Sequence, residues 1–274
     1  MQEIFYLNGQ ILPAAQANLN ITDLALLRGY GIFDFFKAVD GQTVFMEDHL
    51  DRFENSAKLM HLQVPETREK LREIILELVK LNPHPLLGIK LILTGGYSPD
   101  GYTPTTPNMA VLAKPFKFAD MAKGMKLMAI EYQRELAEVK TLNYAVPIWH
   151  LPQMRAMGAD DYLYHKNGQV SELSRSNVFI IKNERLITPK TGVLYGITRK
   201  RILQFAQNHF EIEERDLSVE EFYAADEVFT SGSTKKIVPI SQVNDHVFAG
   251  GKTGKITQKL QTLFEEHEMA FGQG

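Results

Sequence analysis

Apolar and polar residues alternate in several short stretches of the chain, and these stretches end at residues that favour tight turns. The clearest examples are 4–7 before Asn8-Gly9, 32–39 before Asp40-Gly41, and 161–165 before Lys166-Asn167-Gly168. Further strand-like residues follow the first two turns, at 10–12 and 42–46. Because such turns join neighbouring antiparallel strands, the pattern predicts β-hairpins within an antiparallel or mixed sheet.

A second pattern, with apolar residues three and four positions apart, predicts amphipathic helices. These helices cover residues 47–60, 67–81, 199–210, 218–225 and 255–268. Predicted strands and helices are mixed along the whole chain. The sequence therefore predicts a mixed α/β (α+β) protein.

The segment 114–124, KPFKFADMAKG, separates two strand-like stretches with lysines, a proline and a glycine. We place a domain boundary near residue 120, which gives a smaller N-terminal α/β domain (1–119) and a larger C-terminal α/β domain (120–274). The sequence shows no internal repeat, low-complexity run or charge block. A cleft between two such domains is where we expect a small molecule to bind.

Composition narrows the function classes. Of the 274 residues 44% are hydrophobic, and 30 Lys and Arg against 33 Asp and Glu give a formal charge of -3. The chain can bury a substantial core, and it has no basic field that would attract nucleic acid or an anionic membrane. It has no cysteine, which excludes disulfides and thiol nucleophiles. Its eight histidines lack metal-ligand spacing, so we expect no metal site.

Targeting and membrane signals are also missing from the sequence. The N-terminal residues show no basic flank before a long apolar run. No window approaches the ~20 apolar residues that span a bilayer. We therefore expect a cytoplasmic protein.

Lys140 lies in the sequence VKTLNYA, just before a helical pattern. The residues that follow it are unusually apolar, namely Leu142, Tyr144, Ala145, Val146, Ile148 and Trp149. Such surroundings would disfavour a charged ammonium and leave a nucleophilic amine, whereas the alternative is an ordinary surface lysine. Without a thiol or a metal, the reaction that uses this amine is Schiff-base formation with a carbonyl. Pyridoxal phosphate is the commonest carbonyl cofactor bound in this way.

Glu172 is the candidate acid for the ring nitrogen of such a cofactor. Val170 and Leu173 flank it at a strand-to-turn transition, where its carboxylate would be partly buried. A buried carboxylate requires a cationic partner, and a protonated pyridine nitrogen is one. An exposed glutamate that caps a turn is an equally good interpretation of this stretch.

Two turns are candidates for binding the phosphate dianion. Gly196, Ile197 and Thr198 begin a predicted helix, whose first N–H groups attract anions, although Thr198 could be an ordinary N-cap. Residues 231–234, SGST, follow a strand and offer amides and hydroxyls. The alternative interpretation of residues 231–234 is an ordinary loop that connects two strands.

Arg52 is a candidate for fixed positive charge beside the phosphate. It lies on one face of the predicted helix 47–60. An arginine can bind a phosphate through two parallel hydrogen bonds. The alternative is a solvated arginine paired with Asp48 or Glu47 on the same helix.

Six stretches of the chain, taken in order, resemble the class IV (fold type IV) pyridoxal-phosphate aminotransferases. This family contains branched-chain aminotransferases, D-amino acid aminotransferases and aminodeoxychorismate lyases. The stretches are RGYGIFDFFK, EDHLDRFENSA, KTLNYA, GQVSELSRSNVF, LITPKTGVLYGITRKRIL and ADEVFTSGSTKKIVPI. The resemblance implies a two-domain D-amino acid aminotransferase-like fold, with pyridoxal 5'-phosphate at the domain interface, and usually a homodimer.

The resemblance also implies roles for individual residues. Lys140 resembles the Schiff-base lysine, which also shuttles the α-proton, and Glu172 resembles the partner of the pyridine nitrogen. Other residues that resemble cofactor contacts are Arg52, Ile197, Thr198 and Ser233 at the phosphate, Leu194 against the ring, and Tyr144 near the cofactor.

The strand 32–39 resembles the one that lines the family's substrate pocket. Alternate residues share a face, so Phe33, Phe35 and Lys37 should point together, while Phe36 should lie in the core. Phe33 stands where D-amino acid enzymes carry a carboxylate-binding tyrosine. The loop LTGGYSPDGYTP also lacks their arginine and histidine pair. These differences disfavour D-specificity.

Other positions separate the remaining subfamilies. Phe35 replaces a small residue of branched-chain enzymes, and the narrower pocket would fit a small or slim apolar side chain. Lyases tend to carry threonines at Asp34 and Phe35, yet the glycine-rich loop and the Lys140-to-Asn143 spacing resemble theirs.

The loop that would bind the substrate carboxylate, with Thr234, also departs from the family. Lys235 and Lys236 replace small residues and an acid, and Leu173 replaces a glycine in another motif. A lysine in this loop would add carboxylate affinity or would be solvated, and for Lys236 we expect solvation.

The sequence therefore predicts an aminotransferase that moves the amino group of an apolar, branched-chain-like amino acid to a 2-oxo acid such as 2-oxoglutarate. The alternatives are an aminodeoxychorismate lyase that releases pyruvate and 4-aminobenzoate, and a D-amino acid aminotransferase. A third possibility is a cofactor-binding protein that has lost efficient chemistry.

Overall fold

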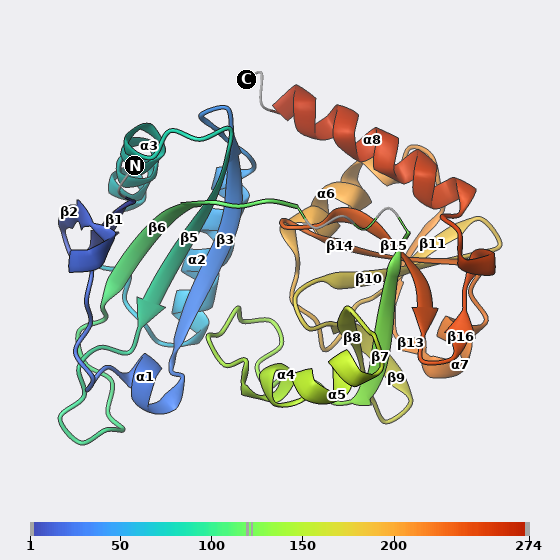
Figure 1. The fold of residues 1–274 in the computed structure, drawn as a ribbon, viewed down its shortest axis with the longest axis horizontal. Coiled ribbons are helices and arrows are strands. Elements are labelled where there is room, and N and C mark those ends of the chain that lie inside the picture. The colour runs from blue at the N-terminus through green and yellow to red at the C-terminus, as the bar shows by residue number, and fades with distance from the viewer. Residues whose placement is uncertain (1–2, 119–120, 122, 272–274) are drawn as a thin grey trace. The chain divides into compact units, whose positions relative to one another are not determined.

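The computed structural model of the chain describes residues 3–118, 121 and 123–271. Contacts between residues divide the chain into two compact units (Figure 1). The first unit is Met1–Lys117 with Val139–Tyr144, and the second is Phe118–Glu138 with Ala145–Gly274. This division departs from the predicted domains in one segment, because residues 139–144 pack with the first unit although they follow the predicted boundary.

The first unit contains an antiparallel sheet in the strand order β2-β1-β6-β5-β3-β4. Its strands are β1 (Ile4–Leu7), β2 (Gln10–Pro13), β3 (Gly31–Val39), β4 (Gln42–Thr43), β5 (Leu86–Thr94) and β6 (Met109–Pro115). The two predicted hairpins of this unit are confirmed. Both residues of the Asn8-Gly9 and Asp40-Gly41 turns have positive φ angles, as the favoured two-residue hairpin turns require.

Two amphipathic helices cover one face of this sheet (Figure 1). The helical elements of the unit are η1 (Ala14–Gln16), α1 (Leu24–Arg28), α2 (Met46–Leu59) and α3 (Arg68–Leu81). Leu50, Phe53 and Ala57 of α2 are buried, four or fewer residues apart, and join the core formed with the sheet. Thr67 caps α3 by accepting a hydrogen bond from the Lys70 N–H.

The strand predicted at 42–46 is shorter than expected. Only Gln42–Thr43 pair with β3, and Phe45 adopts a left-handed backbone conformation with φ of 55°. This turn directs the chain into α2, and Val44 and Phe45 are buried. Their apolar character reflects burial in the core rather than strand formation.

The second unit contains a larger mixed sheet. Its strands are β7 (Met125–Glu131), β8 (Asp161–Lys166), β9 (Gln169–Leu173), β10 (Asn177–Lys182), β11 (Arg185–Pro189), β12 (Ile212–Arg215), β13 (Leu217–Ser218), β14 (Glu227–Gly232), β15 (Lys236–Val243) and β16 (His246–Val247). The predicted hairpin at Asn167-Gly168 is confirmed and joins β8 to β9. A further pairing of β9 with β10 closes the strands β9-β10-β14-β15-β7-β8 into a ring.

The helical elements of this unit are α4 (Ala145–Trp149), α5 (Leu151–Ala156), α6 (Ile197–Ala206), α7 (Val219–Tyr223), η2 (Ala249–Gly251) and α8 (Lys255–Phe271). Helices α6 and α8 lie together beside β14 (Figure 1). The helix predicted at 199–210 begins earlier and ends earlier than expected. Its last predicted residues form a turn, in which the N–H of Phe210 donates to the Ala206 carbonyl.

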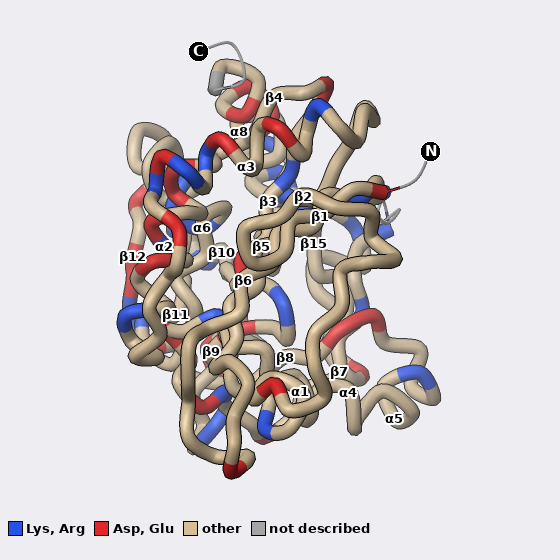
Figure 2. The backbone as a smooth tube through the Cα atoms, turned by 90° about the vertical axis from the view of Figure 1, so that its left-hand side faces the viewer, with Lys and Arg blue, Asp and Glu red and all other residues tan. Residues whose placement is uncertain are grey.

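Basic and acidic residues are interspersed along the backbone (Figure 2). Glu47 of α2, for example, pairs with Arg68 and Arg72 of α3. Within the described residues, no helix is both long and apolar enough to cross a membrane. No group of three or more His, Asp or Glu side chains suited to a metal ion occurs in that part of the chain either.

Candidate active site

The backbone of Lys140 is held against the edge of β3. The Phe33 N–H donates to the Lys140 carbonyl at 2.9 Å, and the Leu142 N–H donates to the Gly31 carbonyl at 2.9 Å. This edge of β3 is open because β4 pairs only with the far end of the strand. Two backbone hydrogen bonds on either side of β3 residue Ile32 therefore fix where the lysine side chain begins.

The Lys140 side chain lies over an aromatic ring. Its Nζ is 4.6 Å from the centroid of the Phe33 ring, and the Tyr144 ring is 5.9 Å from that ring. Two of the apolar neighbours that predicted a desolvated lysine, Ile148 and Trp149, are themselves exposed. Phe33, which is distant in sequence, contacts the amine.

The two faces of β3 differ as predicted. Phe36 is fully buried in the core, which confirms its structural role, and Phe33 and Phe35 alternate with it on the other face. The Phe35 ring packs edge-on against Phe116 at 5.7 Å. Lys37 shares the face of Phe33 but is only 4% exposed. Its predicted contact with substrate stays a prediction.

Arg52 binds a buried carboxylate that sequence analysis did not pair with it. Asp34 on β3 accepts hydrogen bonds from Arg52 Nε at 2.8 Å and Nη2 at 2.7 Å, and from His49 Nδ1 at 2.7 Å. The predicted alternative, a surface pair with Asp48 or Glu47, is wrong because α2 turns Arg52 toward the sheet. Asp34 engages Nε and Nη2 of Arg52, and a guanidinium has further N–H donors that can bind an anion.

The charges in this cluster stabilise one another. Burial would raise the pKa of Asp34, but Arg52 and His49 outweigh burial and hold the pKa well below its usual range. Burial also lowers the pKa of His49, although Asp34 opposes that shift. The Lys140 ammonium contributes to the lower His49 pKa, which places Lys140 in the electrostatic range of this cluster. The carboxylate of Asp34 thus keeps Arg52 in one orientation.

Glu172 lies at the end of β9 and is 3% exposed, so the exposed-cap interpretation is wrong. Arg134 Nε donates to its Oε1 at 2.7 Å, and the Leu194 N–H donates to its Oε2 at 3.0 Å. The sequence argument required a cationic partner for this carboxylate, and Arg134 is one. The protein itself therefore orients Glu172, with the Leu194 backbone beside it.

The first turn of α6 has the features of an anion site. Gly196 precedes the helix, no side chain caps it, and both Ile197 and Thr198 are 5% exposed. Thr198 lies at the second helical position, so its predicted role as an ordinary N-cap is wrong. In the part of the chain that the structure describes, no side chain pairs with the first N–H groups of α6, which can therefore bind a phosphate.

Asn177 fixes the position of this turn. Its Nδ2 donates to the Leu194 carbonyl at 2.7 Å, and a Cβ atom at Gly196 would lie 2.1 Å from its Oδ1. We expect Gly196→Ala to displace Asn177 and weaken phosphate binding about tenfold, the effect of one lost hydrogen bond. Equilibrium titration with a phosphate-bearing ligand measures this loss.

The background Asn177→Ala provides the control, because the clash with residue 196 is then absent. Adding Gly196→Ala to that background should cost little more affinity. A full tenfold loss in both backgrounds would contradict the role given to Asn177.

Strand β14 also has unused hydrogen-bonding capacity just before the turn to β15. Ser231, in this strand, is 1% exposed, and its hydroxyl makes no hydrogen bond to the described residues. Lys235 and Lys236 were predicted to bind carboxylate or to be solvated. Both are instead paired with acids of the second unit, Lys235 with Asp161 at 2.7 Å and Lys236 with α8 glutamates at 3.6 Å. Neither ammonium is simply solvated.

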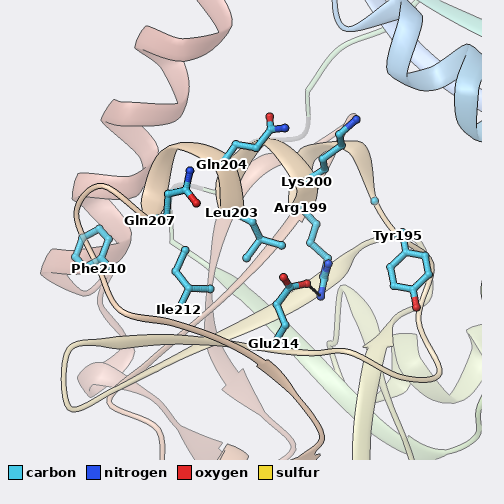
Figure 3. A pocket seen from close by; sticks show the side chains of 10 residues that line it. Tyr195, Arg199, Lys200, Leu203, Gln204, Gln207, Phe210, Ile212 and Glu214 are labelled. Carbon is cyan, nitrogen blue, oxygen red and sulfur yellow. Dashed lines mark ion pairs between the residues drawn. The ribbon is translucent and has the colours of Figure 1, made fainter.

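A surface pocket of about 690 Å³ lies beside the start of α6 (Figure 3). Arg199 reaches into it, but Glu214 pairs with its guanidinium at 2.8 Å and the Pro189 carbonyl accepts a hydrogen bond at 3.0 Å. Glu214 thus offsets the charge of Arg199 in this pocket. The buried arginine instead ties the first turn of α6 to the neighbouring strands.

Several of these residues were missed by sequence analysis. They are Asp34 as the partner of Arg52, His49, Lys90, Arg134, Asp161 and Asn177. Lys90, whose Nζ is 4.9 Å from the centroid of the Phe33 ring, could have been found by alternation along β5, since it pairs directly with Phe35 in register. Arg134 gave no signal in the sequence, because its partner Glu172 lies 38 residues away.

Comparison with known proteins adds an independent line of evidence. The family model "Amino-transferase class IV" matches residues 31–243. A putative branched-chain-amino-acid aminotransferase of Methanocaldococcus jannaschii is 30% identical over 97% of each chain. A D-alanine aminotransferase of Staphylococcus haemolyticus is 26% identical over 96% of each chain.

A solved structure has the same fold. It is the branched-chain aminotransferase from Thermoproteus uzoniensis with norvaline, which is 26% identical and has a TM-score of 0.91 over 99% of this chain and 96% of that one. The predicted fold class and family resemblance are therefore confirmed. With the family model matching most of its length, and six family stretches in order, the chain belongs to the class IV aminotransferases.

Proposed function

We propose that this protein is a pyridoxal 5'-phosphate-dependent transaminase that moves the amino group of an apolar amino acid to a 2-oxo acid. One observation carries the proposal: the chain positions a lysine, Lys140, through two backbone hydrogen bonds beside β3, with its amine over the Phe33 ring. Family membership and the sequence resemblance make this residue the candidate for the covalent link to the cofactor.

The described residues fit such a cofactor. Within the described residues, the first turn of α6 has no side-chain cap and the Ser231 hydroxyl has no hydrogen-bond partner, and such groups suit a phosphate. The Arg52 guanidinium, which Asp34 holds in place, suits the same chemistry. When bound, the cofactor supplies an aldehyde that captures amines and a ring that withdraws electrons. We assign phosphate contacts to Arg52, Ile197, Thr198 and Ser233, and ring contacts to Leu194 and Tyr144.

Two residues would handle protons. Lys140 Nζ would take the proton from the substrate Cα and later return it. Glu172 would stabilise a protonated ring nitrogen, because its carboxylate is buried and held in place by Arg134 and the Leu194 N–H. A protonated ring would withdraw electrons more strongly and so favour proton removal.

The substrate assignment rests on the face of β3 that carries Phe33 and Phe35. Both side chains are partly exposed, and together they offer an apolar surface that suits an apolar amino acid. The related Thermoproteus uzoniensis enzyme was solved with norvaline, a slim apolar amino acid. Thr234 is our candidate for the substrate carboxylate.

Lys90 supports a dicarboxylic 2-oxo acid, such as 2-oxoglutarate, as amino acceptor. Its Nζ is 4.9 Å from the centroid of the same Phe33 ring, and burial lowers its pKa. It makes no ion pair with the described residues, so a second substrate carboxylate would stabilise its charge.

We expect Lys90→Met to raise the KM for 2-oxoglutarate about tenfold, through loss of one charge-assisted hydrogen bond. The KM for pyruvate, which has a single carboxylate, should stay within about twofold. Steady-state kinetics with both acceptors measure the difference. An equal rise in the KM for both acceptors would show that Lys90 does not bind the second carboxylate.

The experiment that tests the function is a substrate panel. The purified protein is loaded with pyridoxal phosphate, and the loss of its yellow absorbance is followed with L- and D-amino acids. Conversion by apolar L-amino acids supports the proposal, whereas conversion by D-alanine alone would make it a D-amino acid aminotransferase. Pyruvate release from aminodeoxychorismate without an acceptor would select the lyase. If no substrate changed the absorbance, the protein would be a cofactor-binding protein without efficient chemistry.

We further propose a homodimer. In the first unit Ile21, Leu26 and Tyr102 are exposed by 74, 69 and 81%. The loop that carries Tyr102 lies against α1, since a Cβ atom at Gly101 would be 3.7 Å from the Leu27 side chain. A second copy of the chain would cover these exposed apolar side chains. Light scattering should give twice the 31.1 kDa chain mass.

The cytoplasmic location stays a prediction.

A further inference from the structure

A buried ion pair lies at the end of the strand ring in the second unit. Asp161, the first residue of β8, is 1% exposed. Its Oδ1 accepts hydrogen bonds from the Tyr162 N–H and the Ser174 hydroxyl, and its Oδ2 accepts one from Lys235 Nζ at 2.7 Å. Burial would raise the pKa of Asp161, but Lys235 and these hydrogen bonds lower it. Asp161 is therefore a charged anchor for other turns.

Lys235 connects this anchor to the turn between β14 and β15. Its side chain is 11% exposed, and its Nζ also donates to the Ser176 hydroxyl at 3.2 Å. That hydroxyl accepts a hydrogen bond from Thr230 in β14 at 2.8 Å. Polar contacts thus tie together the start of β8, the turn after β9, and both sides of the β14–β15 turn.

The β14–β15 turn has an unusual backbone. Lys236 has a φ angle of 58°, in the left-handed region that favours glycine. A lysine in this conformation is strained, and such strain persists only where the surroundings hold the backbone in place. The Lys235 side chain, one residue earlier, supplies a buried ionic constraint of this kind.

We propose that Lys235 is a positioning residue, which acts with Asp161 to hold the Ser233–Thr234 turn in its anion-binding conformation. The inference rests on the proposed function, which gives Ser233 a phosphate contact. Because Asp161 neutralises the Lys235 ammonium, Lys235 does not act as an anion ligand itself. Lys235 instead holds the turn that carries the proposed anion ligand, Ser233.

The experiment uses the full chain freed of cofactor and measures dissociation constants for pyridoxal phosphate and for pyridoxal. Pyridoxal lacks the phosphate, so it reports on the rest of the site. We expect Lys235→Met to raise the pyridoxal phosphate Kd about tenfold or more, through loss of the Ser233 contact. The pyridoxal Kd should change less than about twofold.

Lys236→Met is the matched control. It removes the same charge from the next residue, whose ion pairs with α8 are longer, at 3.6 Å, and more exposed. The pyridoxal phosphate Kd should stay within about twofold, which excludes a simple loss of positive charge near the phosphate. Lys235→Arg should recover most of the affinity, because it keeps a cation opposite Asp161.

The double variant Asp161→Asn with Lys235→Met covers the case in which the single variant fails to fold. It leaves no unpaired buried charge, so it should fold as the wild type does in thermal unfolding. The double variant should still bind pyridoxal phosphate as weakly as Lys235→Met, because neither variant holds the turn in place.

Two results would overturn the inference: wild-type affinity for pyridoxal phosphate in the double variant, or equal losses for both ligands in Lys235→Met. A wild-type protein that does not prefer pyridoxal phosphate over pyridoxal would instead refute the proposed function.

Discussion

Replacing Lys140 by alanine should abolish transamination, with a loss of at least ~10³-fold in kcat. The variant loses both the amine that links to the cofactor and the group that moves the proton at the substrate Cα. Its fold should be retained, because the lysine backbone rather than its side chain makes the hydrogen bonds to β3. Single-turnover conversion of an L-amino acid measures the chemical step, and the absorbance of the borohydride-treated protein measures the covalent link.

Lys58→Ala is a suitable control, since Lys58 is an exposed lysine on α2 in the same unit. It should form the covalent link and turn over as the wild type does. A Lys140→Ala variant that still trapped the cofactor covalently with borohydride would show that another lysine performs this role. Rescue by an added small amine would support proton transfer as the second function of Lys140.

The second large effect concerns Glu172. We expect Glu172→Gln to lower kcat about a hundredfold while the cofactor Kd changes much less. Glutamine can still accept a hydrogen bond from Arg134, but it carries no charge to keep a proton on the ring nitrogen. Exchange of the substrate α-proton with deuterated solvent, followed by NMR, isolates the affected step.

Glu221→Gln provides the comparison for this variant. Like Glu172, Glu221 is paired with an arginine of the second unit, Arg215, at 2.6 Å. Glu221 lies on α7 rather than on β9. Its loss should leave α-proton exchange unchanged. If Glu172→Gln weakened cofactor binding as strongly as it slowed exchange, Glu172 would be a binding residue rather than one that tunes the ring.

Three buried carboxylates illustrate how the candidate site is built. Asp34, Glu172 and Asp161 are each at most 3% exposed, and each is paired with a cation from a distant part of the sequence. Their partners are Arg52, Arg134 and Lys235, which lie 18, 38 and 74 residues away. A buried carboxylate without such a partner would destabilise the fold by several kcal/mol, about 3–5 when one partner of a pair is removed. These pairs therefore orient the candidate ligands and keep the site folded.

The element types followed from the sequence because their causes are local. The Asn-Gly and Asp-Gly turns adopt positive φ angles that few other dipeptides adopt easily, and the three-and-four spacing in 67–81 suffices to predict α3. Phe36 was also predictable as core, since alternation alone separates it from Phe33. The family stretches, read in order, identified the class IV aminotransferases.

Tertiary structure alone decided which distant groups meet. Nothing in the local sequence shows that the Lys140 segment occupies the open edge of β3, or that Phe33 lies near its amine. It also decided that Arg52 binds Asp34 instead of its helix neighbours. The physical reason is that turn and helix preferences act over a few residues, whereas the partner of a buried charge is selected by desolvation and close approach in the folded chain.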